Sequence, residues 1–182
     1  MKVTKTKLPG LLIIEPQIFP DGRGYFFESY NKIKFANAGI DVDFVQDNQS
    51  FSHKGAVRGL HAQIAPYAQA KLIRVIQGSV LDVVVDIRKN SPTYGQYETI
   101  ELNSSNQLQF FIPEGFLHGF ATLEDDTIFA YKVNNYYSKE CEVGVRWDDP
   151  TLAINWGLNQ ADILISPKDE ALPLFADWNS LF

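Results

Sequence analysis

The chain is poor in cysteine and in long apolar runs, and each shortage excludes a class of protein. Its 182 residues include one cysteine, Cys141, so neither an internal disulfide nor a multi-cysteine zinc site can form. Apolar runs such as Leu11–Ile14 are far shorter than the roughly 20 residues that span a bilayer. The apolar stretch after the basic N-terminus is too short for a signal peptide. We therefore expect a cytoplasmic protein with no membrane partner.

Positive charge is also in short supply. The 16 basic residues are outnumbered by 22 acidic residues, which gives a formal net charge of −6 at pH 7. Affinity for nucleic acid depends on Lys and Arg side chains that neutralise phosphates, so we expect no nucleic-acid partner. Locally grouped basic residues can still hold a small anionic ligand. Aromatic residues, at 13% of the chain, are numerous enough to build a large core and to line a pocket.

What the chain does contain is a series of short strand-like segments separated by single glycines and prolines. The clearest is Ser79–Arg88. Its odd-numbered residues from 81 to 87 are all apolar, and the even-numbered residues between them include Asp82 and Asp86. Both faces of this strand are therefore predicted to be buried, one of them with carboxylates inside. The pattern predicts one mainly β domain over residues 1–182, with a helix at Asn31–Ala38 and other short helices chiefly in the C-terminal third. The other predicted strands are Leu11–Glu15, Gly24–Tyr30, Asp43–Phe51, Lys71–Ile76, Tyr97–Leu102, Gln107–Ile112, Ile128–Val133 and Val143–Trp147.

Two of the three histidines lie in settings that indicate a particular fold. His118 ends a P-x-G-x-x-H stretch, which has the form of the second cupin motif, a turn that directs a histidine into a barrel. Where metal-binding cupins have two histidines separated by one residue, this chain has His61 and Gln63, and glutamine is a poor ligand for a transition metal. We therefore predict a cupin-type jelly-roll β-barrel without a catalytic metal. Taken singly, either histidine is more often a hydrogen-bonded structural residue.

A pocket without metal can carry out proton transfer if it holds a base, an acid and a group that stabilises charge. His61 is the natural base, because histidine titrates near neutral pH. Lys71 begins an apolar strand; it is a surface residue if it points outward and a stabiliser of a developing oxyanion if it points inward. Tyr131 is either a core tyrosine or an acid. Asp169 would ordinarily be a turn or helix-cap residue.

A resemblance to a known family rests on segments distributed along most of the chain. No single segment is decisive, but the whole series in this order is specific. The segments are 19–30, 44–48, 57–61, 68–72, 82–88, 91–95, 112–120, 131–132, 136–138, 147–150 and 165–169. With them the chain resembles the dTDP-4-dehydrorhamnose 3,5-epimerases.

The resemblance implies a homodimeric isomerase without a cofactor, active in dTDP-rhamnose biosynthesis for cell-surface polysaccharide. Such an enzyme inverts C3 and C5 of dTDP-4-dehydro-6-deoxyglucose, both next to the C4 ketone, to give dTDP-4-dehydro-L-rhamnose. By the same resemblance His61 is the base, Asp169 orients it, Tyr131 is the acid and Lys71 steadies the enolate oxygen, while Tyr137 stacks on thymine. The residues that match substrate-binding positions are Arg23, Phe26, Glu28, Gln46, Asp47, Asn48, Arg58, Lys71, His118, Tyr137, Glu142 and Lys168.

Three residues depart from the family pattern and keep alternatives open. Ala62 replaces an aromatic residue after the catalytic histidine, Ala70 replaces a glycine and Lys139 replaces a proline. Ala62 leads us to expect a pocket wall that is either wider or refilled from elsewhere, and it leaves open whether both carbons are inverted. One alternative is therefore an epimerase that acts at C3 or C5 alone. A second is a non-catalytic cupin that binds nucleotide sugars, which should lack at least one catalytic group, and a third is a metal-dependent cupin.

Overall fold

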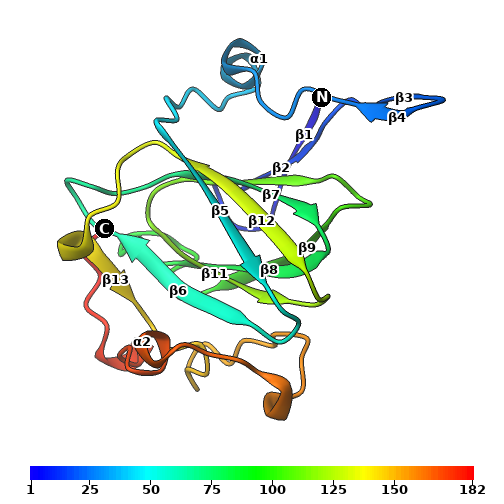
Figure 1. Cartoon of the computed structure of the whole chain (residues 1–182). Helices are drawn as coiled ribbons and strands as arrows, with labels where there is room; N and C mark the ends of the chain where they lie inside the picture. Colours follow the sequence, from blue (N-terminus) through cyan, green and yellow to red (C-terminus); the bar gives the residue numbers. More distant parts are fainter.

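The computed structural model describes residues 1–182, which form two β-sheets that face each other (Figure 1). The six-stranded sheet has the order β1-β2-β10-β7-β12-β5, and the five-stranded sheet has the order β13-β6-β11-β8-β9. Neighbouring strands are antiparallel throughout. The strands are β1 (Lys2–Lys5), β2 (Leu12–Glu15), β5 (Gln46–Ser52), β6 (Val57–Gln63), β7 (Lys71–Gln77), β8 (Ser79–Asp86), β9 (Tyr97–Asn103), β10 (Gln109–Ile112), β11 (Phe116–Thr122), β12 (Thr127–Val133) and β13 (Glu142–Gly144). The expected mainly β jelly-roll is confirmed, except that the two sheets do not close into a barrel.

A separate hairpin and a short helix precede the first long strand of the six-stranded sheet. The hairpin joins β3 (Phe19–Asp21) to β4 (Gly24–Phe26) and projects away from both sheets (Figure 1). The helix α1 (Lys32–Asn37) begins after Asn31, whose side chain accepts a hydrogen bond from the Lys34 N–H. This confirms the helix predicted at this place.

The remaining helices are single turns in the C-terminal third, as expected. They are η1 (Lys139–Cys141), η2 (Gln160–Asp162), α2 (Pro167–Glu170) and η3 (Phe175–Asp177). None of the helices is both long and apolar enough to cross a membrane.

Apolar side chains pack in three layers. The central layer lies between the sheets and includes Ile73 and Phe129 from one sheet and Val84 and Phe120 from the other. A second layer covers the outer face of the five-stranded sheet, beneath the C-terminal segment. A third lies on the outer face of the six-stranded sheet, where Phe35 of α1 packs. The C-terminal segment and α1 therefore each cover the outer face of one sheet.

Two strands that matter for the site, β6 and β11, were not among the predicted strands. Both are interrupted by glycine, which weakens the sequence pattern of a strand. A Cβ on Gly59 would lie 2.7 Å from backbone atoms of β11, and one on Gly119 would lie 2.7 Å from the Arg58 carbonyl of β6. The pairing shifts register at this crossing, between His118 and Phe120. The glycines thus permit the close approach that aligns His61 with His118 as direct partners across the two strands.

Candidate active site

A cavity of about 500 Å³ opens between the two sheets. Its walls come from β5, β6, β7, β11 and β12, and its rim comes from the segment that leads into α2. The structure therefore brings together residues that are up to 119 positions apart in the sequence, from Ser50 to Asp169. The predicted site residues that line it are Arg58, His61, Lys71, His118, Tyr131, Lys168 and Asp169.

His61 and Asp169 form a hydrogen-bonded pair at the cavity wall. His61 Nε2 lies 2.7 Å from Asp169 Oδ1, and Asp169 Oδ2 accepts a longer bond from the Gly59 N–H at 3.4 Å. Ser166 caps α2 and so fixes the position of Asp169 on its single turn. Burial raises the pKa of Asp169, but the bonds from His61, Gly59 and Ser166 outweigh it and hold the pKa below its usual value. The ionised carboxylate accepts from Nε2–H and leaves Nδ1 as the basic nitrogen of the ring.

Lys71 lies at the start of β7 and faces the cavity from the six-stranded sheet. Burial lowers the pKa of its ammonium to about 8, against the opposing charges of Asp82 and Glu142. Lys71 is therefore still mostly charged at neutral pH, but it gives up its proton more readily than an exposed lysine. Of the two orientations considered for Lys71, the structure shows the one in which the side chain points into the cavity and not onto the surface.

Tyr131 enters the cavity from β12, also in the six-stranded sheet, where it packs against the central core. His61 enters from β6 in the five-stranded sheet. Burial raises the pKa of the Tyr131 hydroxyl, so the phenol is protonated at neutral pH and can donate a proton. A ring held between the sheets would thus meet an imidazole on one side and a phenol on the other.

His118, which lines the cavity, forms a second histidine–carboxylate pair with the buried Asp82. His118 Nε2 is 2.9 Å from Asp82 Oδ2, and Asp82 is completely buried. Burial lowers the pKa of His118 in spite of the carboxylate beside it, which keeps the ring neutral at neutral pH. Within the whole chain, no three His, Cys, Asp or Glu side chains gather in a way that could hold a metal ion.

Glu142 connects two further predicted residues at the rim. Its Oε2 accepts hydrogen bonds from Lys168 Nζ at 2.6 Å and from the Tyr137 hydroxyl at 2.9 Å. On β5, Gln46 Nε2 donates to Asn48 Oδ1 at 2.8 Å, and Gln46 Oε1 accepts from the Tyr137 N–H at 3.4 Å. These contacts position an exposed aromatic ring and a cation next to the cavity mouth.

A family model for dTDP-4-dehydrorhamnose 3,5-epimerases matches residues 5–177, nearly the whole chain. The chain belongs to this epimerase family. A relative from Shigella flexneri named dTDP-4-dehydrorhamnose 3,5-epimerase is 51% identical over 170 residues, which cover 93% of either chain. The chain is accordingly a carbohydrate epimerase, an isomerase.

Solved structures agree with this family assignment. The dTDP-4-dehydrorhamnose 3,5-epimerase from Elizabethkingia anophelis is 47% identical, with a TM-score of 0.93 and 97% of each chain covered. A 3,5-epimerase from Legionella pneumophila, solved with dTDP-4-keto-L-rhamnose, is 44% identical with a TM-score of 0.93, over 98% of this chain and 94% of that one. A 3'-monoepimerase from Streptomyces bikiniensis is less similar, at 34% identity, a TM-score of 0.88, and 94% and 86% coverage.

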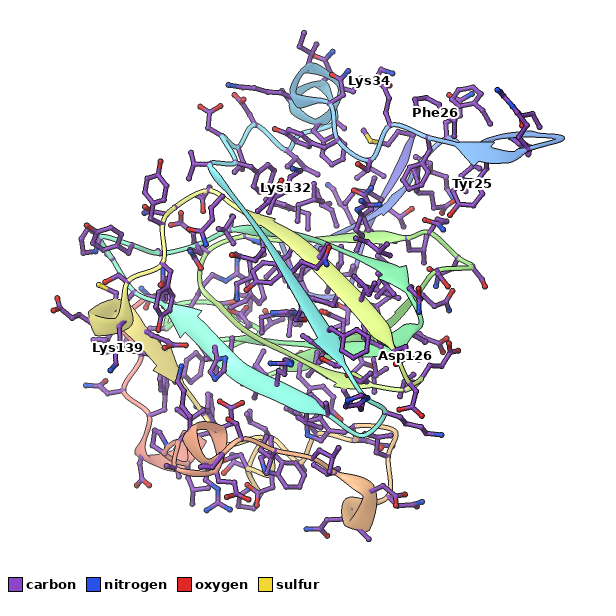
Figure 2. All side chains as sticks on the ribbon, viewed as in Figure 1. Tyr25, Phe26, Lys34, Asp126, Lys132 and Lys139 are labelled. Carbon is purple, nitrogen blue, oxygen red and sulfur yellow. The ribbon has the colours of Figure 1, made fainter.

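Eight predicted binding residues do not line the cavity of this epimerase. Four of them, Gln46, Asn48, Tyr137 and Glu142, belong to the rim contacts described above, and the other four lie elsewhere. Arg23 and Phe26 lie on the projecting hairpin, where the Arg23 side chain is 91% exposed and pairs with Asp21 (Figure 2). Glu28 follows the hairpin and pairs with Lys34. Asp47 lies on the outer face of β5 and pairs with Lys132 of β12, so only its neighbours Gln46 and Asn48 face inward.

Ala62 does not widen the pocket, contrary to expectation. Successive side chains of a strand point to opposite faces, so Ala62 faces away from the cavity that His61 lines. It is buried in the outer layer of the five-stranded sheet, opposite Val143 of β13. This departure from the family pattern therefore does not lie at the cavity wall.

Sequence reasoning also missed cavity residues that carry no obvious chemistry. Ser50 on β5 lines the cavity, and its buried hydroxyl has no hydrogen-bond partner. Phe120 and Phe129 stack with ring centroids 4.1 Å apart and form an apolar wall. Alternate residues of a strand line the same face, so Ser50 faces the same way as Gln46 and Asn48 on this strand. Their prediction as binding residues could therefore have identified Ser50 as well.

Proposed function

We propose that this epimerase inverts dTDP-4-dehydro-6-deoxyglucose at both C3 and C5 to give dTDP-4-dehydro-L-rhamnose. The observation that supports this most strongly is the arrangement of His61 and Tyr131, which enter one cavity from opposite sheets. Lys71 enters the same cavity. Removal of a proton on one side of a sugar ring and return of a proton on the other side changes the configuration of that carbon.

The first step is proton abstraction next to the ketone. His61 Nδ1 takes the proton from C3, and the electron pair of that C–H bond moves into the C4 carbonyl to form an enolate. Lys71 stabilises the negative oxygen, a type of interaction that contributes about 2.7–4 kcal/mol in other enzymes. Asp169 holds the ring in the right tautomer and stabilises the imidazolium that forms.

The second step is reprotonation from the opposite side. Tyr131 donates its phenolic proton to C3, the electron pair returns from the oxygen, and the ketone forms again. A positioned acid and a positioned base each contribute on the order of 10²–10⁴-fold. The imidazolium then loses its proton to solvent and the phenolate regains one. The same cycle at C5 completes the double inversion, with no group beyond those of the chain and the substrate.

The nucleotide is assigned to the rim. We expect Arg58 and Lys168 to bind the diphosphate, since guanidinium and ammonium groups recognise phosphate oxygens. We expect Tyr137, which is 56% exposed, to stack on the thymine ring. Gln46, Asn48, His118 and Glu142 are the remaining candidates for substrate contacts.

Deuterium incorporation tests this function directly. The purified protein is incubated with the nucleotide sugar in deuterated water, and the product is analysed by NMR and by coupling to the reductase that consumes it. We expect deuterium at C3 and C5 and a product that the reductase accepts. Label at one carbon alone would support the single-site epimerase, and no label would support a non-catalytic binding protein.

The hairpin residues suggest a homodimer in which each subunit completes the site of the other. Arg23 and Phe26 lie on the projecting hairpin and Glu28 follows it, and none of the three lines the cavity of its own chain; Figure 2 labels Phe26 on the hairpin. Exposed aromatic rings on such an arm, here Tyr25 at 58% and Phe26 at 66%, are typical of interfaces. A shallow groove of about 360 Å³ on the outer face of β5, β7 and β12 offers a surface for a second copy.

Complementation between inactive variants tests the shared site. His61→Ala is refolded together with the double variant Arg23→Ala/Phe26→Ala, so that half of the dimers combine one chain of each kind. If the hairpin serves the partner, each mixed dimer has one intact site, and activity returns to about a quarter of the wild-type value. If the hairpin serves its own chain, the mixture stays inactive. A cytoplasmic location remains a prediction from the sequence.

A further inference from the structure

Asp82 is a buried carboxylate that takes no part in the proposed proton transfers. It lies on the inner face of β8, is 0% exposed, and makes one hydrogen bond, from His118 Nε2 at 2.9 Å. Its other oxygen, Oδ1, is buried without any partner. A carboxylate oxygen left unpaired in the interior is costly, so a group of this kind normally persists because something nearby needs it.

Asp86 shows what a purely structural carboxylate looks like on the same strand. It lies on the same inner face, four residues further on, and is also 0% exposed. Both of its oxygens are satisfied by Arg88, Ser91 and Thr93, at distances of 2.6–3.0 Å. Asp82 has no such cation bonded to it. Burial raises the pKa of Asp82, and the groups that oppose this rise and favour its charged form are the His118 ring and the Lys71 ammonium.

We propose that Asp82 is a positioning residue for the epimerisation, which orients the His118 ring and balances the charge of Lys71. By accepting from Nε2–H, the carboxylate fixes the His118 tautomer and leaves Nδ1 as an acceptor. Its negative charge favours the protonated form of Lys71, the form that can stabilise an enolate oxygen. This inference rests on the function proposed above, because it assigns Asp82 to the group at the substrate carbonyl.

The charges around Lys71 determine the expected pH dependence. Asp82 on β8 and Glu142 on β13 raise the pKa of Lys71 against the effect of burial. The other titratable groups of the cavity are His61, Arg58, His118, Tyr131, Lys168 and Asp169. Removing the charge of Asp82 leaves Glu142 as the one carboxylate that opposes burial, so Lys71 loses its proton at a lower pH. Activity should then fall off earlier as the pH rises.

The test compares Asp82→Asn with the wild type in kcat measured across pH. Asparagine keeps the shape of the side chain and can still accept from His118, but it carries no charge. We expect the alkaline limb of the kcat profile to move to lower pH, so that the ratio of kcat near pH 8 to kcat near pH 6 falls about fivefold for a displacement of one pH unit. KM should change much less than kcat.

Two further variants separate this role from a general loss of structure. Asp86→Asn removes an equally buried carboxylate outside the cavity, and it should lower stability without moving the pH profile. Asp82→Glu restores the charge, and its profile should keep the wild-type position even if kcat is lower. An unmoved alkaline limb in folded Asp82→Asn, or a limb that moves equally in Asp82→Glu, would overturn the proposal. Absence of turnover in the wild type would instead overturn the proposed function.

Discussion

The molecule holds two histidine–carboxylate pairs on neighbouring strands, and they differ mainly in their access to a ligand. His61 and His118 face each other across β6 and β11, and their Nε2 atoms lie 2.7 and 2.9 Å from Asp169 and Asp82. The His61 side chain is 27% exposed, and the His118 side chain is 9% exposed. Asp169 lies on a single helical turn near the C-terminus, whereas Asp82 lies within the sheet.

The difference shows that the same two side chains serve different purposes at different depths. A base must exchange protons with its substrate and then with solvent, which requires a ring nitrogen that both can reach. His61 meets this requirement, while burial keeps His118 neutral and confines it to hydrogen bonding. The pair at the wall therefore suits catalysis, and the deep pair suits orientation.

The largest effect should come from His61→Ala. Loss of the base should reduce turnover by about 10⁴-fold, while the affinity for dTDP, measured by calorimetry, changes by less than about threefold. His118→Ala should raise KM but leave deuterium exchange at the substrate carbons measurable. If exchange disappears equally in both variants, the two histidines do not have the separate roles inferred here.

Tyr131→Phe should separate exchange from inversion. His61 can still remove and return protons on its own side of the ring, but the opposite side has lost its acid. Inversion should fall by about 10³-fold, whereas NMR should still detect exchange of deuterium into the substrate. A variant that loses exchange as completely as inversion would show that Tyr131 has another task.

Asp169→Asn should have a smaller effect than removal of His61 itself. The amide can still contact the ring, but it cannot stabilise the imidazolium, so kcat should fall by about 10²-fold, the lower end of the range for acid–base catalysis. KM should stay near the wild-type value, because Asp169 contacts His61 and the Gly59 N–H rather than the nucleotide rim. Equal losses in kcat and in affinity for dTDP would point to a distorted rim instead.

The smallest effect concerns the stability of the fold. It comes from Asp86, the carboxylate of β8 whose hydrogen bonds are satisfied, in contrast to Asp82 on the same strand. Burial raises the pKa of Asp86, but bonds from Arg88, Ser91 and Thr93 outweigh it and lower the pKa to about 2. A lowered folded-state pKa stabilises the fold above the unfolded value of about 3.9, and this contribution of about 2.5 kcal/mol is lost as the pH falls towards 2.

Urea denaturation at a series of pH values from about 5 to about 2.5 measures this contribution. The free energy of unfolding of the wild type should fall across this range by more than that of Asp86→Asn. The variant should be less stable than the wild type near neutral pH. Identical acid dependence in the two proteins would show that Asp86 is not the group responsible.

Much of the fold was predictable because strand patterns are local. The alternation in Ser79–Arg88 correctly predicted a strand with both faces buried and with Asp82 and Asp86 inside. The helix at α1 was predicted to end before Gly39, and Gly39 does follow its C-terminal cap, with φ at 91°. The prediction about Ala62 was wrong, although the alternation of β6 already implies that it faces away from His61. β6 and β11 themselves went unrecognised, since their glycines serve a contact between strands rather than a local pattern.

The sequence by itself determined the family and the kinds of groups that carry the chemistry: imidazole, ammonium, phenol and carboxylate. Only the tertiary structure decided which sheet each group comes from, that Asp169 reaches His61 across 108 residues, and that the hairpin residues lie outside their own cavity. The physical reason is that register and strand pairing depend on both partners at once. The sequence of either segment alone therefore does not predict which segment it pairs with.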